Sequence, residues 1–172
     1  KKMGFNKDRA REMQWLFTNQ KVEQTTSPHV LDGQMMFAKA IGVTDLTPKW
    51  QLPIPAESVE KAKQWLDPMR KNVVISPCSS KAEKDWLIER YADIANWLIA
   101  QNINVILVGS PAKRELEMTA CIQQLALDVQ NLVGKTSLKE LAALLKLADL
   151  VISPDTGSAH IASIQGTPVI GL

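Results

Sequence analysis

The stretch that decides the fold is the last twenty residues, 153–172, which read SPDTGSAHIASIQGTPVIGL. The apolar run at 150–153 has the length and β-branched composition of a buried strand, and PDTG at 154–157 is typical of a tight turn. Residues 158–165 can form a short helix before a glycine ends it, and residues 168–172 begin another buried strand. The stretch therefore predicts a strand, a turn and a helix N-terminus that lies between two strands.

The start of this predicted helix is suited to binding an anion. Asp155 or Thr156 can cap the helix with a side-chain oxygen, and Gly157 lets a ligand approach the backbone closely. The free N–H groups of the first turn and the positive end of the helix dipole favour phosphate, and His160 follows about one turn later. Because a free carboxylate would repel a phosphate, we expect Asp155 to act as the cap. The alternative is a plain cap followed by a structural histidine that contacts no ligand.

Upstream, between residues 72 and 152, apolar strands alternate with amphipathic helices. In the helices, apolar residues recur every three or four positions, as at Leu87, Tyr91, Ile94 and Leu98. Such alternation predicts a parallel sheet covered by helices on both faces, in a Rossmann-like α/β fold. We expect strands at 73–76, 105–108 and 129–133, and helices at 84–100, 112–127 and 137–148.

The N-terminal part of the chain differs in composition from this regular region. It contains one clear amphipathic pattern, which predicts a helix at 29–42. Residues 43–55 include three prolines and are typical of an extended linker, and another helix is predicted at 57–67. We therefore divide the chain into the tail of one domain at 1–42, a linker at 43–55 and a second domain at 56–172.

A second group of polar residues follows the first predicted strand of the sheet. In parallel α/β sheets, ligands bind beyond the carboxyl ends of the strands. The loop at 77–83 has this position and contains Ser79 and Ser80, with Lys84 at the predicted start of the next helix. Hydroxyl groups, backbone N–H groups and a lysine at a helix start form an anion cradle, so helix starts near Ser79 and Thr156 together suit a diphosphate. The alternative is a serine cap with solvated lysines.

Other kinds of site lack the residues that they need. The sequence GKT at 134–136 suggests a phosphate loop, but that motif requires a glycine five residues earlier, where Val129 stands. No Asp-x-Asp pair or Cys/His cluster has the spacing of metal ligands. We therefore expect neither a metal nor another cofactor.

Composition and charge are those of an ordinary globular protein. Of the 172 residues, 45% are hydrophobic and 22% charged, and no apolar run reaches membrane-span length or forms a signal-peptide pattern. We expect a cytoplasmic protein, and a formal charge of +2 gives no reason to expect a nucleic-acid partner. Cys78 and Cys121 fit neither a zinc site nor a disulfide framework, as is usual in a reducing compartment. Because the chain opens on Lys1 and stops within an apolar strand, we interpret it as a fragment.

The pattern DTGxxHxAxxxGTP at 155–168 resembles the signature of glycosyltransferase family 9, the heptosyltransferases that build the inner core of bacterial lipopolysaccharide. The resemblance implies a GT-B fold, in which residues 56–172 are a truncated, donor-binding C-terminal domain and residues 1–42 end the acceptor-side N-terminal domain. It implies inverting transfer of heptose from ADP-heptose, a substrate rather than a cofactor, to a Kdo sugar on lipid A. Such an enzyme would be cytoplasmic and peripheral to the inner membrane. Its general base, a carboxylate, would lie in the missing part of the N-terminal domain, so no catalytic residue is assigned here.

The resemblance also assigns binding residues. Residues 109–111 are similar to the family's loop near the ribose, where Lys113 stands in place of an acidic residue that many members carry, with Glu115 two positions on. Thr136 lies in a loop similar to the one beside the adenine. Arg9 and Arg11 would contact the anionic acceptor, or else form a solvated charge run. The implied donor-binding residues are Ser79, Ser80, Lys84, Asp155, Thr156, Gly157 and His160.

Three other functions fit parts of the sequence. Lys113 leaves open a GT-B transferase that uses another nucleotide sugar, and the same domain could be a non-catalytic nucleotide-binding module. Cys78 and His160, both at strand ends, could form a thiol hydrolase, although no acid stands at an evident spacing to orient the histidine.

Overall fold

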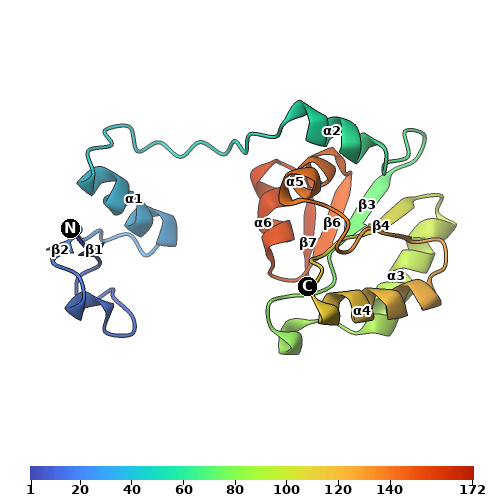
Figure 1. The fold of residues 1–172 in the computed structure, drawn as a ribbon, viewed down its shortest axis with the longest axis horizontal. Helices are drawn as coiled ribbons and strands as arrows, with labels where there is room; N and C mark the ends of the chain where they lie inside the picture. Colours follow the sequence, from blue (N-terminus) through green and yellow to red (C-terminus); the bar gives the residue numbers. More distant parts are fainter. The chain divides into compact units, whose positions relative to one another are not determined.

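The computed structural model describes residues 1–172, and the chain divides into two compact units, Lys1–Lys49 and Trp50–Leu172 (Figure 1). The division falls inside the segment 43–55, which contains neither helix nor strand. Prolines at 48, 53 and 55 have no N–H to donate, which disfavours both helix and sheet in this segment.

The first unit is held together by one pair of strands and one helix. Its elements are strand β1 (Met3–Gly4), 3-10 helix η1 (Gln14–Leu16), strand β2 (Gln20–Lys21), which pairs with β1 in parallel, and helix α1 (Val30–Ala40). Helix α1 confirms the helix predicted at 29–42, and His29 caps it by accepting a hydrogen bond from the Leu31 N–H. The Phe5 ring meets Phe37 edge to face, with the ring centroids 4.8 Å apart, and so joins α1 to the strands.

The second unit contains a five-stranded sheet in which all neighbouring strands run parallel. This confirms the predicted Rossmann-like sheet. The strand order is β5-β4-β3-β6-β7, so the order reverses between β3 and β6, and doubly wound sheets bind ligands at such a reversal. The strands are β3 (Asn72–Ile75), β4 (Asn104–Leu107), β5 (Gln130–Asn131), β6 (Leu150–Ser153) and β7 (Val169–Gly171).

Helices cover both faces of this sheet (Figure 1). They are α2 (Ala56–Lys63), α3 (Ile88–Ala100), α4 (Lys113–Leu125), α5 (Leu138–Leu147) and α6 (Gly157–Ile164). Successive residues of a strand point to opposite faces. Val73 and Ile75 therefore pack in a core with α3 and α4, whereas Val74 packs in a second core with α2, α5 and α6. Strands β3, β4 and β6 are buried on both faces, which explains why they are apolar without alternation. The edge strand β7, expected to be buried, is largely exposed.

The helix predicted at 84–100 starts later than expected. Lys84 ends a separate 3-10 helix, η2 (Ala82–Lys84), and α3 begins only at Ile88. Between them, Asp85 has an extended backbone, and its carboxylate accepts a hydrogen bond from the Ser79 N–H. Trp86 packs against the core and meets the Tyr91 ring edge to face at 5.4 Å. These two tertiary contacts keep residues 85–87 out of the helix.

The remaining helix predictions for this unit differ only at their ends. Helices α4, α5 and α6 begin and end within two residues of the predicted limits. Helix α2 ends at Lys63 rather than at 67, because Trp65 and Leu66 donate to carbonyls three residues earlier and so form turns.

Candidate functional site

A cavity of 630 Å³ opens at the carboxyl edge of the sheet. The loops after β3, β4, β5 and β6 form its wall, so the loop at 77–83 and the turn at 154–157 border one cavity, as predicted. Because β3 and β6 are the strands between which the order reverses, the cavity occupies the usual ligand position of a doubly wound sheet.

The start of α6 faces this cavity without a side-chain cap. Thr156 is the N-cap residue, but its Oγ1 lies 2.7 Å from Ser153 Oγ and no side chain accepts from the first turn. The expectation that Asp155 or Thr156 caps this helix with its side chain is therefore wrong. By helix geometry the first-turn N–H groups have no intrahelical acceptor, so those of Gly157 and Ser158, two residues that line the cavity, remain available to a ligand.

Asp155 instead lies between two basic side chains. Its Oδ1 is 3.3 Å from His160 Nε2, and its Oδ2 is 3.9 Å from Lys84 Nζ. All three side chains are more than half exposed, with Lys84 the least at 53%. Ion pairs at such exposed positions contribute little to stability, so Lys84 and His160 can exchange Asp155 for an anionic ligand at small cost.

The loop after β3 is not a helix start, which corrects the predicted pair of helix N-termini. Ser79 is buried, its N–H donates to Asp85 Oδ1 at 2.6 Å, and its hydroxyl donates to the Lys81 carbonyl. Ser80 is the exposed member of the pair, and both serines line the cavity. One helix start and one irregular loop therefore border the place expected for a diphosphate.

At the end of the cavity expected to face the nucleoside, the acidic side chain comes from Glu115. Its carboxylate accepts from the Ser110 N–H at 2.8 Å and from the Ser110 hydroxyl, and both residues line the cavity. A Cβ at Gly109 would lie 2.5 Å from Glu115 Oε2, so a larger residue there would displace this carboxylate. Lys113 does not line the cavity; its Nζ faces Glu117 Oε1 at 3.7 Å on the exposed side of α4.

Thr136 also lines the cavity, next to the start of α5. That start is closed by a capping box, in which Ser137 Oγ accepts from the Glu140 N–H and Glu140 Oε2 accepts from the Ser137 N–H at 2.7 Å. Lys61 lies 2.7 Å from the same carboxylate. The Lys61 ammonium, followed by the Ser137 N–H, lowers the pKa of Glu140 to about 2.

Two features of the site were not predicted from the sequence. The hydroxyls of Ser76 and Ser158, both buried, lie 3.1 Å apart and join the end of β3 to the start of α6 beside the cavity. In the sequence, the signal for this contact is Ser76, a polar residue that directly follows an apolar strand. Asp85 and Arg114 form an ion pair across the loop after β3, and no local pattern indicates it.

The predicted acceptor residues belong to the first unit. Arg9 donates to the His29 carbonyl at 3.1 Å and to the Ser27 carbonyl at 3.5 Å, and its guanidinium lies 5.6 Å from the centre of the Phe5 ring. These contacts tie the loop before α1 to β1, so Arg9 has a structural function in this unit. Arg11 is exposed.

Cys78 is buried and lines the cavity, and its side chain is a protonated thiol. Burial, together with the nearby charge of Glu115, raises the pKa of its thiol to about 11, and its Sγ lies 3.3 Å from Met118 Sδ. The thiol is therefore protonated near neutral pH. This argues against the thiol hydrolase.

The fold and cavity together define a Rossmann-like domain, with a helix start open to an anion at the strand reversal. The chain belongs to glycosyltransferase family 9 (heptosyltransferase), because the family model matches residues 1–172. It is 56% identical over 172 residues to the lipopolysaccharide core heptosyltransferase OpsX of Haemophilus influenzae, covering 99% of this chain and 50% of that protein. It is 29% identical over 152 residues to lipopolysaccharide heptosyltransferase 3 of Escherichia coli, covering 84% of this chain and 44% of that protein.

Solved structures share the same fold. A family 9 glycosyltransferase from Veillonella parvula superposes with a TM-score of 0.76 at 22% identity, over 91% of this chain and 47% of that one. The E. coli heptosyltransferase WaaC with ADP superposes with a TM-score of 0.67 at 25% identity, over 98% of this chain and 53% of that one. The chain thus spans about half the length of the curated relatives that it matches. None of its helices has both the length and the apolar character needed to span a bilayer.

Proposed function

We propose that this chain supplies the donor-binding half of an inverting heptosyltransferase. The reaction passes heptose from ADP-heptose to the Kdo or inner-core acceptor of lipopolysaccharide, which lies at a membrane surface, and the protein works on the cytoplasmic side. Family membership and two relatives named as lipopolysaccharide heptosyltransferases support the reaction class. The WaaC structure with ADP supports the donor nucleotide.

The observation that carries the proposal is the uncapped start of α6 at the cavity. Thr156 is the N-cap residue of α6 and has a hydroxyl that can cap the helix. In the structure this hydroxyl bonds to Ser153 instead. The N–H groups of Gly157 and Ser158 are left free at the cavity. Lys84 Nζ and His160 Nε2 lie 3.9 Å and 3.3 Å from the carboxylate of Asp155, which also lines the cavity, so donors and positive charge converge at one place. A diphosphate satisfies both, because its oxygens accept hydrogen bonds and carry the negative charge that a helix N-terminus favours.

In the reaction, the bond between the anomeric carbon and the diphosphate oxygen breaks, and its electron pair goes to the departing ADP. The α6 N–H groups, Lys84 and His160 stabilise the charge that develops there, and one such donor typically contributes about 10²- to 10³-fold in rate. The acceptor hydroxyl attacks the opposite face and gives its proton to a carboxylate that we place outside residues 1–172. No metal is assigned, because these groups supply the positive charge.

At the other end of the cavity, we assign Glu115 to the ribose of the donor. Its carboxylate lines the cavity and already accepts two hydrogen bonds from Ser110, which fixes its orientation. The sugar hydroxyls can donate to its remaining lone pairs. Thr136 lies on the wall nearest the start of α5 and is assigned to the adenine side.

Gly157→Pro tests the assignment of the α6 start. Proline removes one N–H donor but is favoured at the first position of a helix, and Thr156 has the extended backbone that precedes proline (φ −138°, ψ 169°). In the full-length protein, we expect the Kd for ADP to rise about tenfold or more, since hydrogen bonds to charged groups are strong. Isothermal titration calorimetry measures the change.

Gly157→Ala is the matched control, because it keeps the N–H and its Cβ meets no atom of the chain within 4 Å. We expect Gly157→Ala to bind ADP much more tightly than Gly157→Pro. If Gly157→Pro binds ADP with wild-type affinity, the start of α6 does not bind the diphosphate.

The same measurement on the wild type tests the choice of nucleotide. Equal affinity for ADP, UDP and GDP would favour a transferase that uses another nucleotide sugar.

A further inference from the structure

We propose that Asp85 and Arg114 are positioning residues that hold the loop after β3 in its donor-binding conformation. The inference rests on the proposed function, since it concerns the same cavity. Neither side chain lines the cavity, so both act through the residues that do.

The pair holds the backbone of Ser79 from both sides. Asp85 Oδ1 accepts from the Ser79 N–H at 2.6 Å, and Asp85 Oδ2 accepts from Arg114 Nη1. Arg114 Nη2 in turn donates to the Ser79 carbonyl. One guanidinium therefore bonds to a carboxylate and to a backbone carbonyl at the same time, which its planar fork permits and a lysine ammonium does not reproduce.

The loop contains little regular secondary structure. Between β3 and α3 its only regular element is the three-residue η2, and α3 begins beyond it at Ile88. Ser79 and the adjacent Ser80 line the cavity, so any shift of the Ser79 backbone moves the polar groups that face the donor. The orientation of these groups therefore depends on the ion pair.

Arg114 also connects the two ends of the cavity. It is the second residue of α4, and the next residue, Glu115, holds Ser110 at the nucleoside end. Neighbouring residues on a helix point in directions about 100° apart, so the first turn of α4 can reach both loops at once. The diphosphate loop and the nucleoside loop are thus anchored to one helical turn.

The ion pair also neutralises the negative charge of Asp85, which would otherwise repel an anionic donor. The Asp85 side chain is only 11% exposed, and Arg114 is the cation that faces it. Without Arg114, a largely buried carboxylate would stand unpaired beside the diphosphate loop, which is unfavourable for that loop and for a bound anion.

The test uses Arg114→Lys and Asp85→Asn in the full-length protein. Arg114→Lys keeps the positive charge but replaces the planar guanidinium fork with a single nitrogen on a shorter side chain, so the two-nitrogen contact to Asp85 and the Ser79 carbonyl is lost. We therefore expect the Kd for ADP and the KM for the donor to rise about tenfold. We expect a smaller increase in Asp85→Asn, which keeps an acceptor for the Ser79 N–H. Hydrogen exchange of the peptide containing Ser79 should become faster in both variants.

Arg90→Met is the matched control. Arg90 pairs with Asp93 on α3 at 3.6 Å, with both side chains more than 60% exposed and away from the cavity. This variant should keep the wild-type ADP affinity and hydrogen exchange. A merely structural ion pair predicts a lower thermal midpoint for Arg114→Lys with unchanged ADP affinity of the folded protein, and that result would overturn the inference.

The two proposals can fail separately. If the wild type does not bind ADP, or Gly157→Pro binds it normally, the proposed function fails. If Gly157→Pro weakens binding while Arg114→Lys binds ADP within twofold of wild type and exchanges normally at Ser79, only the positioning inference fails.

Discussion

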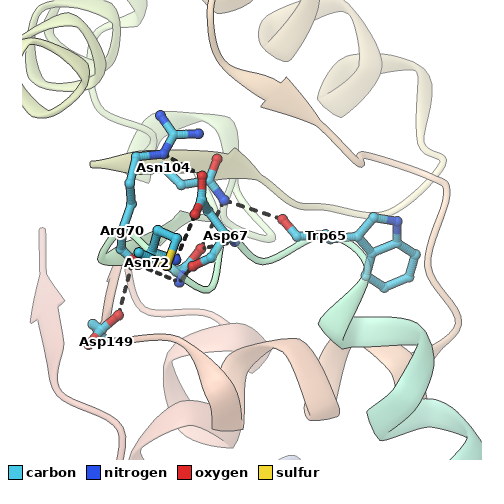
Figure 2. Close-up of polar contacts among 7 residues, drawn as sticks. Trp65, Asp67, Arg70, Asn72, Asn104 and Asp149 are labelled. Atoms are coloured by element: carbon cyan, nitrogen blue, oxygen red, sulfur yellow. Dashed lines mark hydrogen bonds and ion pairs between the residues drawn. The ribbon is translucent and has the colours of Figure 1, made fainter. Parts of the chain in front are cut away.

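The two edges of the sheet carry hollows of nearly equal size, 630 Å³ at the carboxyl edge and 600 Å³ at the amino edge. At the amino edge, the polar groups bond to one another around Asn72, as Figure 2 shows. At the carboxyl edge, the start of α6 leaves N–H groups without acceptors. Cavity size therefore does not distinguish the two edges, whereas unsatisfied hydrogen-bonding groups do.

The amino edge is closed by a single buried side chain. Asn72 Oδ1 accepts from the Asp67 N–H at 2.8 Å and from Asn104 Nδ2 at 2.9 Å, while Asn72 Nδ2 donates to the carbonyls of Asp67 and Arg70, both at 3.0 Å. The Asn72 N–H donates to Asp149 Oδ2 at 2.8 Å. All donors and acceptors of the amide are used, so this network binds the turn before β3 to the sheet and leaves no free group of Asn72 for a ligand.

A similar contrast exists within the carboxyl edge. The start of α5 is closed by the capping box of Ser137 and Glu140, whereas the start of α6 has no side-chain cap. Both helices begin beside the same cavity. Helices α3 and α4, which also begin at this edge, lack a side-chain cap as well, so the closed start of α5 is the exception here.

The largest expected effect concerns the isolated chain. We expect residues 1–172 to bind ADP but to transfer no heptose, because the general base is proposed to lie elsewhere. A coupled assay of ADP release with donor and acceptor measures this, with the full-length protein as the positive control. Measurable transfer by the isolated chain would show that the carboxyl edge and its surroundings are sufficient for the reaction.

Asn72→Ala tests the amino edge. The substitution removes four side-chain hydrogen bonds and leaves buried partners unpaired, so we expect a loss of about 2 to 4 kcal/mol in the free energy of unfolding. Urea denaturation measures this loss. The ADP affinity of the folded variant should remain that of the wild type.

Asn96→Ala is the control for that substitution, because exposed Asn96 makes a single side-chain hydrogen bond, to the Leu125 carbonyl. We expect it to change stability much less. If Asn72→Ala weakened ADP binding while leaving stability intact, the functional contrast between the two edges would be wrong.

The smallest expected effect is the acid dependence of stability at the closed start of α5. The pKa of Glu140 is lowered from 4.5 to about 2 in the folded protein, chiefly by Lys61 and then by the Ser137 N–H. A lowered pKa contributes stability that is present above pH 4.5 and is lost as the pH falls toward about 2. Glu140→Gln should therefore lose less stability than the wild type over this interval, as measured by urea denaturation at each pH.

Glu57→Gln, on the neighbouring helix α2, is the matched control, since Glu57 takes part in no ion pair. We expect it to keep the acid dependence of the wild type. An identical acid dependence in Glu140→Gln would mean that the capping box does not hold the carboxylate as the structure has it.

Most of the second unit could be predicted because its signals are local. The apolar runs at 105–108 and 150–153 have strand length, and the spacing of apolar residues in α4 and α5 identifies the faces that they bury. The loops at the carboxyl edge followed from the parallel order of these strands. Within the site, the prediction that loops bearing Ser79 and Thr156 approach the same cavity depended only on that order.

The errors arise where distant residues compete for a local group. The spacing of apolar residues extends the predicted helix back to Lys84, but Asp85 bonds to Ser79 and to Arg114, which is 29 residues away. Aspartate is a residue type that commonly caps helices, which is why Asp155 was expected to cap α6. In the structure its carboxylate instead lies beside Lys84 and His160. Likewise, Glu115 lines the cavity and Lys113 does not, because their side chains point in different directions from α4. A sequence motif does not specify these directions.

The sequence by itself determined the class of fold, the order of its strands and helices, and the turn at 154–157 that carries the family signature, because these depend on hydrophobic periodicity and on residues close together in the chain. Only the tertiary structure decided which helix start remains open and which closes, which carboxylate enters the cavity, and how Asp85 and Arg114 hold the loop after β3. Each of these outcomes is a choice among several possible partners for one polar group. That choice depends on distances between residues far apart in the chain, which exist only once the sheet has formed.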